Sequence, residues 1–288
     1  MITTYEPLLT SSFLLYLNNR IQAGYSGIYN VGTQLYSMPF QSYYGLYTYS
    51  TPFKPWIYDA SVPGATVMTG VILNGVPITK GQSGLVEFDY EHGDVYFSAP
   101  LPVGSILSGN YSFSEVDVVL SSYPDINQLF ETRLTLRPKQ PQTPTGRYNN
   151  QLSYPTIYLK NEIGNNKPWA FGGNQMTETT INAYIFAESQ FQLDNICSCF
   201  KDANYQYVPY INQSEFPMNN YGGFKNNIPY NYTGLIGNRV AQGQGVLISD
   251  VSITDWGRRG INAEISRMTT ESFFSLVTFK LTRERITQ

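Results

Sequence analysis

Apolar residues near the N-terminus recur at steps of three and four, which is the pattern of one helical face. These residues are Leu9, Phe13, Tyr16, Leu17 and Ile21, and the pattern stops near Gly24. Thr3 and Glu6 have the spacing of a capping box, and Pro7 falls in the first turn, where its missing N–H costs least. We therefore predict a first helix that ends near Gly24 and packs its apolar face on a core.

A second helix is predicted from Ser189 to Ala203. Ser189 and Gln192 again have capping-box spacing. The apolar positions that follow have the i, i+3, i+4, i+7 spacing of one helical face: Leu193, Ile196, Cys197 and Phe200. On this pattern Cys197 packs as a small apolar residue.

Between the two helices the chain first changes to a β pattern. Asn74-Gly75 separates two short apolar runs, which is a strong hairpin signal. A second hairpin is predicted from residues 85–90 and 95–97, and alternation over 112–120 predicts a further strand. Residues 24–56 are dense in Tyr, Gly, Ser and Pro, which predicts either a long ordered loop or short strands.

A Pro-rich stretch separates this β region from the rest of the chain. Three prolines lie within seven residues of the segment 137–150, which excludes a helix and favours an extended linker. Beyond it, alternation predicts strands at 156–159, 179–187, 246–254, 261–268 and 273–282. Together with the second helix, these strands predict an α+β fold with a mixed or antiparallel sheet.

Composition limits the function classes. The chain has 288 residues, of which 42% are hydrophobic, 15% aromatic and only 14% charged. A surface so poor in charge and so rich in Tyr, Asn and Ser suits extensive protein contact. The net charge of −3 and the absence of a basic run argue against a nucleic-acid binder.

Three features that are absent from the sequence predict the cellular compartment of the protein. No apolar run has the length of a membrane span, and the first residues have no basic region typical of a signal peptide. The two cysteines, Cys197 and Cys199, are too few for a disulfide framework. We therefore expect a chain made in a reducing cytoplasm, without membrane contact.

An inventory of reactive residues predicts that the protein is not an enzyme. His92 is the only histidine, and neither a Gly-x-Ser-x-Gly elbow nor a phosphate-binding glycine loop is present. His92 is expected to be a polar residue of a hairpin turn. Glu87, Asp89 and Glu91 alternate with apolar residues, which predicts the solvent-exposed face of a strand. No catalytic residue, cofactor or metal site is assigned.

The order of these elements resembles that of a known family. A helix, two strands, a second helix and terminal strands follow one another, if residues 24–150 are an insertion. The strand that ends Phe186-Ala187-Glu188-Ser189 leads directly into a helix, and an aromatic strand, 273–281, lies near the C-terminus. This arrangement resembles the tail-terminator and neck (head–tail connector) proteins of tailed bacteriophages. The resemblance covers half of the chain, and short family members have no counterpart of residues 71–120.

The resemblance implies a domain organisation. Residues 1–23 are the N-terminal helix of the main α+β domain, which residues 151–288 complete as a terminator-like domain. Residues 24–136 are an inserted β-rich region of hairpins, and residues 137–150 are the linker.

The resemblance also implies a structural role in the virion. Such proteins form homo-oligomeric rings, commonly hexamers, that join the tail tube to the head and contact other tail and neck proteins. DNA passes through their channel without sequence-specific recognition, and assembly takes place in the host cytoplasm. Subunits of this kind extend a β-sheet from one copy to the next.

Aromatic loops supply the candidate contacts with subunits and partners. The candidates are Tyr43, Tyr44, Tyr47, Tyr49, Trp56, Tyr221, Tyr230, Tyr232, Arg258 and Arg259. Two other functions fit the same residues. One is a different virion role, in the baseplate or on the capsid, and the other is a β-rich adhesin that stacks aromatic rings on glycans.

Overall fold

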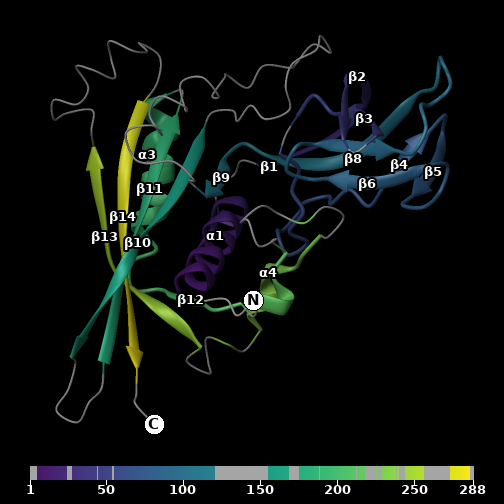
Figure 1. Ribbon diagram of the computed structural model, residues 1–288. Helices are drawn as coiled ribbons and strands as arrows, with labels where there is room; N and C mark the ends of the chain where they lie inside the picture. Colours follow the sequence, from purple (N-terminus) through teal and green to yellow (C-terminus); the bar gives the residue numbers. More distant parts are fainter. Residues whose placement is uncertain are drawn as a thin grey trace.

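The computed structural model describes residues 5–24, 28–43, 45–53, 55–120, 155–168, 175–187, 189–211, 213–217, 225, 229–237, 239, 244–255 and 273–285. The Pro-rich segment 137–150 and the predicted strand 261–268 lie outside these residues. The fold is α+β, with one six-stranded and two four-stranded sheets. The long six-stranded sheet and the pair of smaller sheets lie on opposite sides of the N-terminal helix (Figure 1).

The first helix, α1 (Tyr5–Gly24), ends where the apolar pattern ends. It is buried on more sides than an amphipathic helix because it contacts β9, β10 and β12 of the large sheet as well as α3 and α4. The predicted face is buried, and so are Leu14, Leu15 and Asn18 outside it. The carboxylate of Glu6 accepts hydrogen bonds from Asn161 Nδ2 at 2.9 Å and Gly164 N at 3.1 Å. Thr3 lies outside the described residues.

The six-stranded sheet is antiparallel except at one edge, where β9 pairs parallel to β10. In spatial order its strands are β12 (Tyr207–Pro209), β13 (Gly245–Asp255), β14 (Phe273–Arg285), β11 (Gln175–Ala187), β10 (Thr156–Pro168) and β9 (Asp117–Leu120). The strands predicted at 156–159 and 179–187 are therefore confirmed but longer. Alternation in β11 is also confirmed, since Ile181, Ala183 and Ile185 are fully buried against the helices.

The second helix, α3 (Gln190–Lys201), packs on the same sheet face as α1. Its predicted start is confirmed because Ser189 Oγ accepts a hydrogen bond from Gln192 N at 3.2 Å. Its apolar face is buried, and Cys197 packs within the hydrophobic core as expected. Phe279 of β14 joins the two helices to the sheet, with ring centroids 5.0 Å from Phe13 and 5.5 Å from Phe200.

The β-rich region contains two four-stranded sheets. The first consists of β1 (Ile28–Gln34), β8 (Leu107–Ser114), β4 (Gly70–Leu73) and β5 (Val76–Thr79). The second consists of β2 (Tyr36–Tyr43), β3 (Leu46–Ser50), β7 (Asp94–Phe97) and β6 (Leu85–Asp89). Both predicted hairpins are confirmed. In the first turn Asn74 and Gly75 have φ values of 50° and 83°, as a type I′ turn requires.

The single strand predicted over 112–120 is wrong, because these residues form two strands in different sheets. β8 ends at Ser114 in the β-rich region, and β9 starts at Asp117 in the six-stranded sheet. Ser114 Oγ donates a 2.7 Å hydrogen bond to Val116 O across the break. Alternation identifies extended residues but does not indicate the sheet to which they belong.

Two short elements complete the described part of the chain, and the helix of this pair contacts α1. These are the 3-10 turn η1 (Gln213–Glu215) and the helix α4 (Tyr232–Ile236), which Asn231 caps through a 2.7 Å hydrogen bond from Gly234 N. None of the helices that the structure describes has the length and hydropathy needed to span a membrane.

Candidate functional site

A buried carboxylate joins α1, the β-rich region and α4. Asp59 is 1% exposed. Its oxygens accept hydrogen bonds from Asn19 Nδ2 of α1 at 2.8 Å and from the Tyr232 amide at the start of α4 at 3.0 Å. The Ser61 amide and hydroxyl also donate to it, at 2.9 and 2.7 Å. These bonds replace the water that a buried carboxylate loses, so Asp59 fixes the junction between the two regions.

Aromatic rings surround this junction. Tyr58 stacks on Tyr90 with centroids 5.4 Å apart and meets the edge of Tyr230 at 5.3 Å. Trp56 lies 5.3 Å from Tyr111, and its indole N–H donates to Thr51 Oγ1 at 2.8 Å. Burial raises the pKa of Tyr90 to about 12, and its hydroxyl donates to Met68 O at 2.8 Å. The ring cluster is therefore a neutral, structural core.

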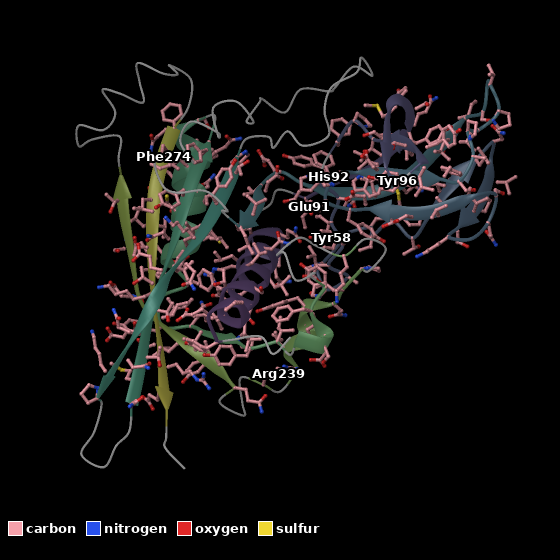
Figure 2. All side chains as sticks on the ribbon, viewed as in Figure 1. Tyr58, Glu91, His92, Tyr96, Arg239 and Phe274 are labelled. Atoms are coloured by element: carbon pink, nitrogen blue, oxygen red, sulfur yellow. The ribbon has the colours of Figure 1, made fainter. Side chains whose placement is uncertain are left out.

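The turn of the second hairpin carries the only histidine, and this turn lies at the end of the β-rich region nearest α1 (Figure 2). His92 Nδ1 and Asp89 Oδ2 are 2.8 Å apart, and Asp89 also accepts from His92 N at 3.0 Å and Tyr96 Oη at 3.2 Å. The His92 side chain is 35% exposed, whereas the Asp89 side chain is 7% exposed. The turn is thus closed around one buried carboxylate.

Two opposing effects set the pKa values of this pair. Burial by itself lowers the pKa of His92, but the hydrogen bond and charge of Asp89, with the charges of Glu91 and Asp94, raise it above 6.5. Burial likewise raises the pKa of Asp89, but the hydrogen bond and charge of His92 lower it below 3.8. The charged pair is therefore favoured between these two pKa values.

The prediction that Glu87, Asp89 and Glu91 share an exposed strand face is wrong for Asp89. Asp89 is only 5% exposed, so it is buried like its neighbours Phe88 and Tyr90. The reason is the turn that follows. The Asp89 carboxylate is hydrogen-bonded to the amide and to the ring of His92, so it points inward, whereas alternation alone predicts that it faces water.

This turn has partial features of a catalytic site. An Asp–His pair orients the base of many hydrolases. Here Asp89 is hydrogen-bonded to His92 in the turn and to Tyr96 on the following strand. These bonds hold the hairpin together. Within the described part of the chain, no group of three or more His, Cys, Asp or Glu side chains is placed to hold a metal ion.

The ten candidate contact residues have different positions. Tyr47 is 45% exposed on β3. Four others are at most 8% exposed and contact their own chain, so they present no surface to a partner: Tyr49, Trp56, Tyr230 and Tyr232. Tyr43 is part of β2. The remaining four lie outside the described residues: Tyr44, Tyr221, Arg258 and Arg259.

Exposed apolar residues outside the ten candidates lie on both parts of the molecule. Phe191 and Tyr205 are the most exposed on the helical part, and five others lie on the β-rich region. Ile106 is 59% exposed, and it lies beside the first hairpin turn because its amide donates to Asn74 Oδ1 at 2.8 Å. The others on this region are Tyr29, Tyr36, Val76 and Val103. The signal that could have found them is the charge pattern, since residues 25–53, 60–79 and 95–114 contain no charged side chain.

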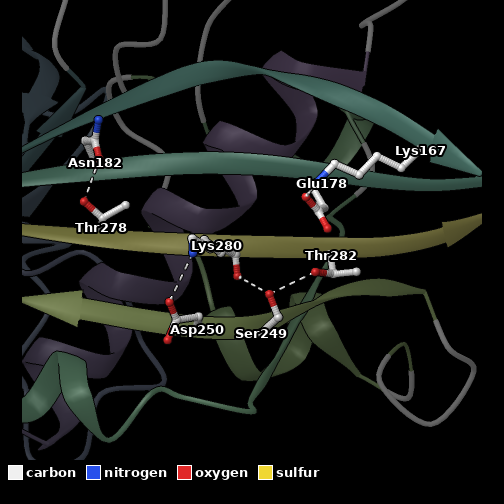
Figure 3. A network of polar contacts seen from close by, with 8 residues as sticks. All are labelled: Lys167, Glu178, Asn182, Ser249, Asp250, Thr278, Lys280 and Thr282. Carbon is white, nitrogen blue, oxygen red and sulfur yellow. Dashed lines mark hydrogen bonds and ion pairs between the residues drawn. The ribbon is translucent and has the colours of Figure 1, made fainter. Parts of the chain in front are cut away.

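The sheet face opposite the helices has a different character in each half. One half carries an aromatic cluster of Tyr158, Tyr184, Phe186 and Phe274. The other half is polar (Figure 3). Its contacts include Thr278 to Asn182 at 3.0 Å, Thr282 to Ser249 at 2.9 Å and the ion pair of Lys280 with Asp250 at 3.5 Å.

Comparison with protein-family models and with curated proteins finds no match for this chain. The chain's own surfaces are therefore the guide to its function.

Proposed function

We propose that the protein is a non-catalytic structural subunit of a symmetric assembly, namely a tail-terminator or neck ring protein in the virion of a tailed bacteriophage. The observation that carries this proposal is the surface of the β-rich region. It presents Tyr29, Tyr47, Val76 and Ile106 at 45% exposure or more. These residues lie within tracts that have no charged side chain.

The physical reason is the cost of keeping such a surface in water. Interface cores are depleted in charge and enriched in Tyr relative to the remaining surface of a protein. A protein that works alone rarely exposes several large apolar residues on one region. The β-rich region therefore fits the role of a contact arm.

The six-stranded part fits the role of the body of a ring subunit. Its two helices cover one face of a sheet with 13-residue strands, which is the element arrangement expected of a terminator-like domain. In this proposal the assembled ring surrounds the DNA channel and contacts tail and neck proteins, and the sheet scaffold holds the β-rich arm in place.

Negative-stain electron microscopy of the purified full chain, with and without isolated tail tubes, tests the proposal. Rings, or tubes capped at one end only, are the expected result, and light scattering gives the number of subunits. A monomer at all concentrations that never caps a tube would overturn the ring role. A glycan array on the same preparation then distinguishes the adhesin alternative, which requires sugar binding.

A further inference from the structure

The strand β1 is an edge strand of the β-rich region. It lies at one edge of the first four-stranded sheet, where only β8 pairs with it among the described strands. None of its seven residues is buried, and Tyr29 near its start is 46% exposed. β1 contains no charged side chain and no proline.

The contacts of β8 show which backbone groups of β1 face outward. Ser112 N donates to Thr66 O and Ser112 O accepts from Ile57 N, both at 2.8 Å, so the backbone of Ser112 points away from β1. Its partner in the ladder is Asn30. In an antiparallel pair the hydrogen-bonding side alternates along the strand. Ile28, Asn30, Gly32 and Gln34 therefore direct their N–H and C=O groups away from β8.

The other described sheet edges carry features that oppose pairing. β5 contains Pro77, β12 contains Pro209, and β2 contains Pro39 and a register shift. β6 carries Glu87 beside a register shift, and β9 is four residues long. Proline, charge, bulges and short length are the usual devices that keep sheet edges from joining. β1 has none of them.

We propose that β1 pairs antiparallel with β1 of a second copy of this chain, around a two-fold axis at Val31. In this register Ile28 lies opposite Gln34, Asn30 opposite Gly32, and Tyr29 opposite Thr33. Every outward-facing backbone group of one strand then meets one on the other. Because the strand itself has no charged residue, no two like charges lie directly opposite each other in this ladder.

A second copy is favoured over a different partner by this self-complementarity. The four outward-facing residues are spaced symmetrically about Val31, so a single register satisfies both strands at once. The inference goes beyond the proposed ring function, because a two-fold contact does not close a six-membered ring. It would join two rings, or two subunits, whatever larger assembly they form.

A cysteine pair across the axis tests the register. Tyr29 and Thr33 form a non-hydrogen-bonded pair in the proposed interface, where opposite Cβ atoms are close enough for a disulfide. The double variant Tyr29→Cys/Thr33→Cys should give a covalent dimer under mild oxidation. Each single variant places its two cysteines far from the axis and should not. Tyr29→Cys/Gln34→Cys is the matched control, because residues 29 and 34 point to opposite faces.

A proline at the strand end tests the backbone pairing. Gln34→Pro removes an outward-facing N–H that β8 does not use, so the fold should be retained while dimerisation weakens about tenfold or more. Gln34→Thr keeps the N–H and should dimerise like the natural chain. Light scattering over a range of concentrations measures both.

The outcomes separate this inference from the proposed function. A chain that is monomeric at high concentration, or cross-linking in the Tyr29→Cys/Gln34→Cys control equal to that of the test pair, overturns the β1 contact. Dimerisation of Gln34→Pro that equals that of Gln34→Thr also overturns the β1 contact, but it leaves the ring function intact. If the natural chain forms neither dimers nor rings, the β1 contact and the ring function are both overturned.

Discussion

The two parts of the molecule satisfy their polar groups in different ways. On the outer face of the six-stranded sheet, long strands carry ion pairs such as Lys280 with Asp250 and Lys167 with Glu178. In the β-rich region, buried N–H and O–H groups bond to neutral oxygens, as in the bonds of Trp56 to Thr51 and of Tyr90 to Met68. Its buried carboxylates, Asp59 and Asp89, each accept several hydrogen bonds from their own chain. The difference shows that low charge need not mean a loosely built region, and that such a region leaves its surface free for protein contact.

A single hydrophobic core nevertheless extends through both parts. It includes Phe13 of α1, Phe279 of the large sheet, and Trp56 and Tyr111 of the β-rich region. Because α1 contacts the large sheet and its Asn19 bonds to Asp59 and Ser61 of the β-rich region, both parts hold α1 in place (Figure 1). We therefore expect the two regions to unfold together, and the predictions below test how far their differences extend.

The largest effect is expected from Trp56→Ala. The side chain is 1% exposed, and its loss leaves a cavity that should lower the free energy of unfolding by about 4 kcal/mol. Phe279→Ala in the large sheet should cost about the same. Urea unfolding followed by circular dichroism should show one transition in both variants. Two transitions, each moved by only one of the variants, would show that the regions unfold independently.

The junction itself is tested by Asp59→Ala. Removal of the carboxylate leaves buried donors at Ser61 and Tyr232 without their acceptor, which should cost about 3 kcal/mol. Asp59→Asn keeps one acceptor oxygen and should cost less. Hydrogen exchange should speed up at the amides of Ser61 and Tyr232 in the Ala variant. Unchanged exchange at both amides would contradict the role given to Asp59.

A pH-dependent difference is expected from His92→Gln. The raised pKa of His92 stabilises the fold most at pH values below 6.5, and this contribution is lost as pH rises through the folded-state pKa. Below pH 3.8 the stabilisation from this pair falls, because Asp89 takes up a proton as the pH drops through its lowered pKa. Because His92 is partly exposed, the variant should lose only about 1 kcal/mol at pH 5 and less at pH 9.

Denaturant unfolding at the two pH values measures this difference. Lys280→Gln provides the control from the other region, because it removes a surface ion pair that contains no histidine. A loss in His92→Gln that is equal at both pH values would rule out a charged His92–Asp89 pair.

The smallest effect on the free energy of unfolding is expected from a substitution of Tyr47. Comparison with Tyr49 on the same strand distinguishes a surface position from a core position. Tyr47→Ser should change the free energy of unfolding by about 0.5 kcal/mol, because the ring is 45% exposed. Tyr49→Ser, two residues later, should cost several times more because Tyr49 is 8% exposed and accepts a hydrogen bond from Leu101 N. Equal costs would mean that Tyr47 also belongs to the core.

Helix ends and hairpin turns were predictable because local interactions decide them. Ser189 caps α3 through a bond three residues along the chain, and Asn74-Gly75 adopts the positive φ values that few other residue pairs tolerate. The candidate contact residues were less predictable. Tyr47 and Tyr49 are of the same type and lie in the same five-residue strand, yet one is exposed and the other buried.

The sequence by itself determined the α+β class, the two helices and the hairpins, since each follows from the spacing of apolar positions and from turn chemistry. Only the tertiary structure decided that residues 112–120 divide between two sheets, that Asp89 turns inward, and that Trp56, Tyr230 and Tyr232 are core. The reason is that burial depends on what a second layer covers. Contacts distant in sequence supply that layer, such as those of α1 with the large sheet and of Tyr230 with Tyr58.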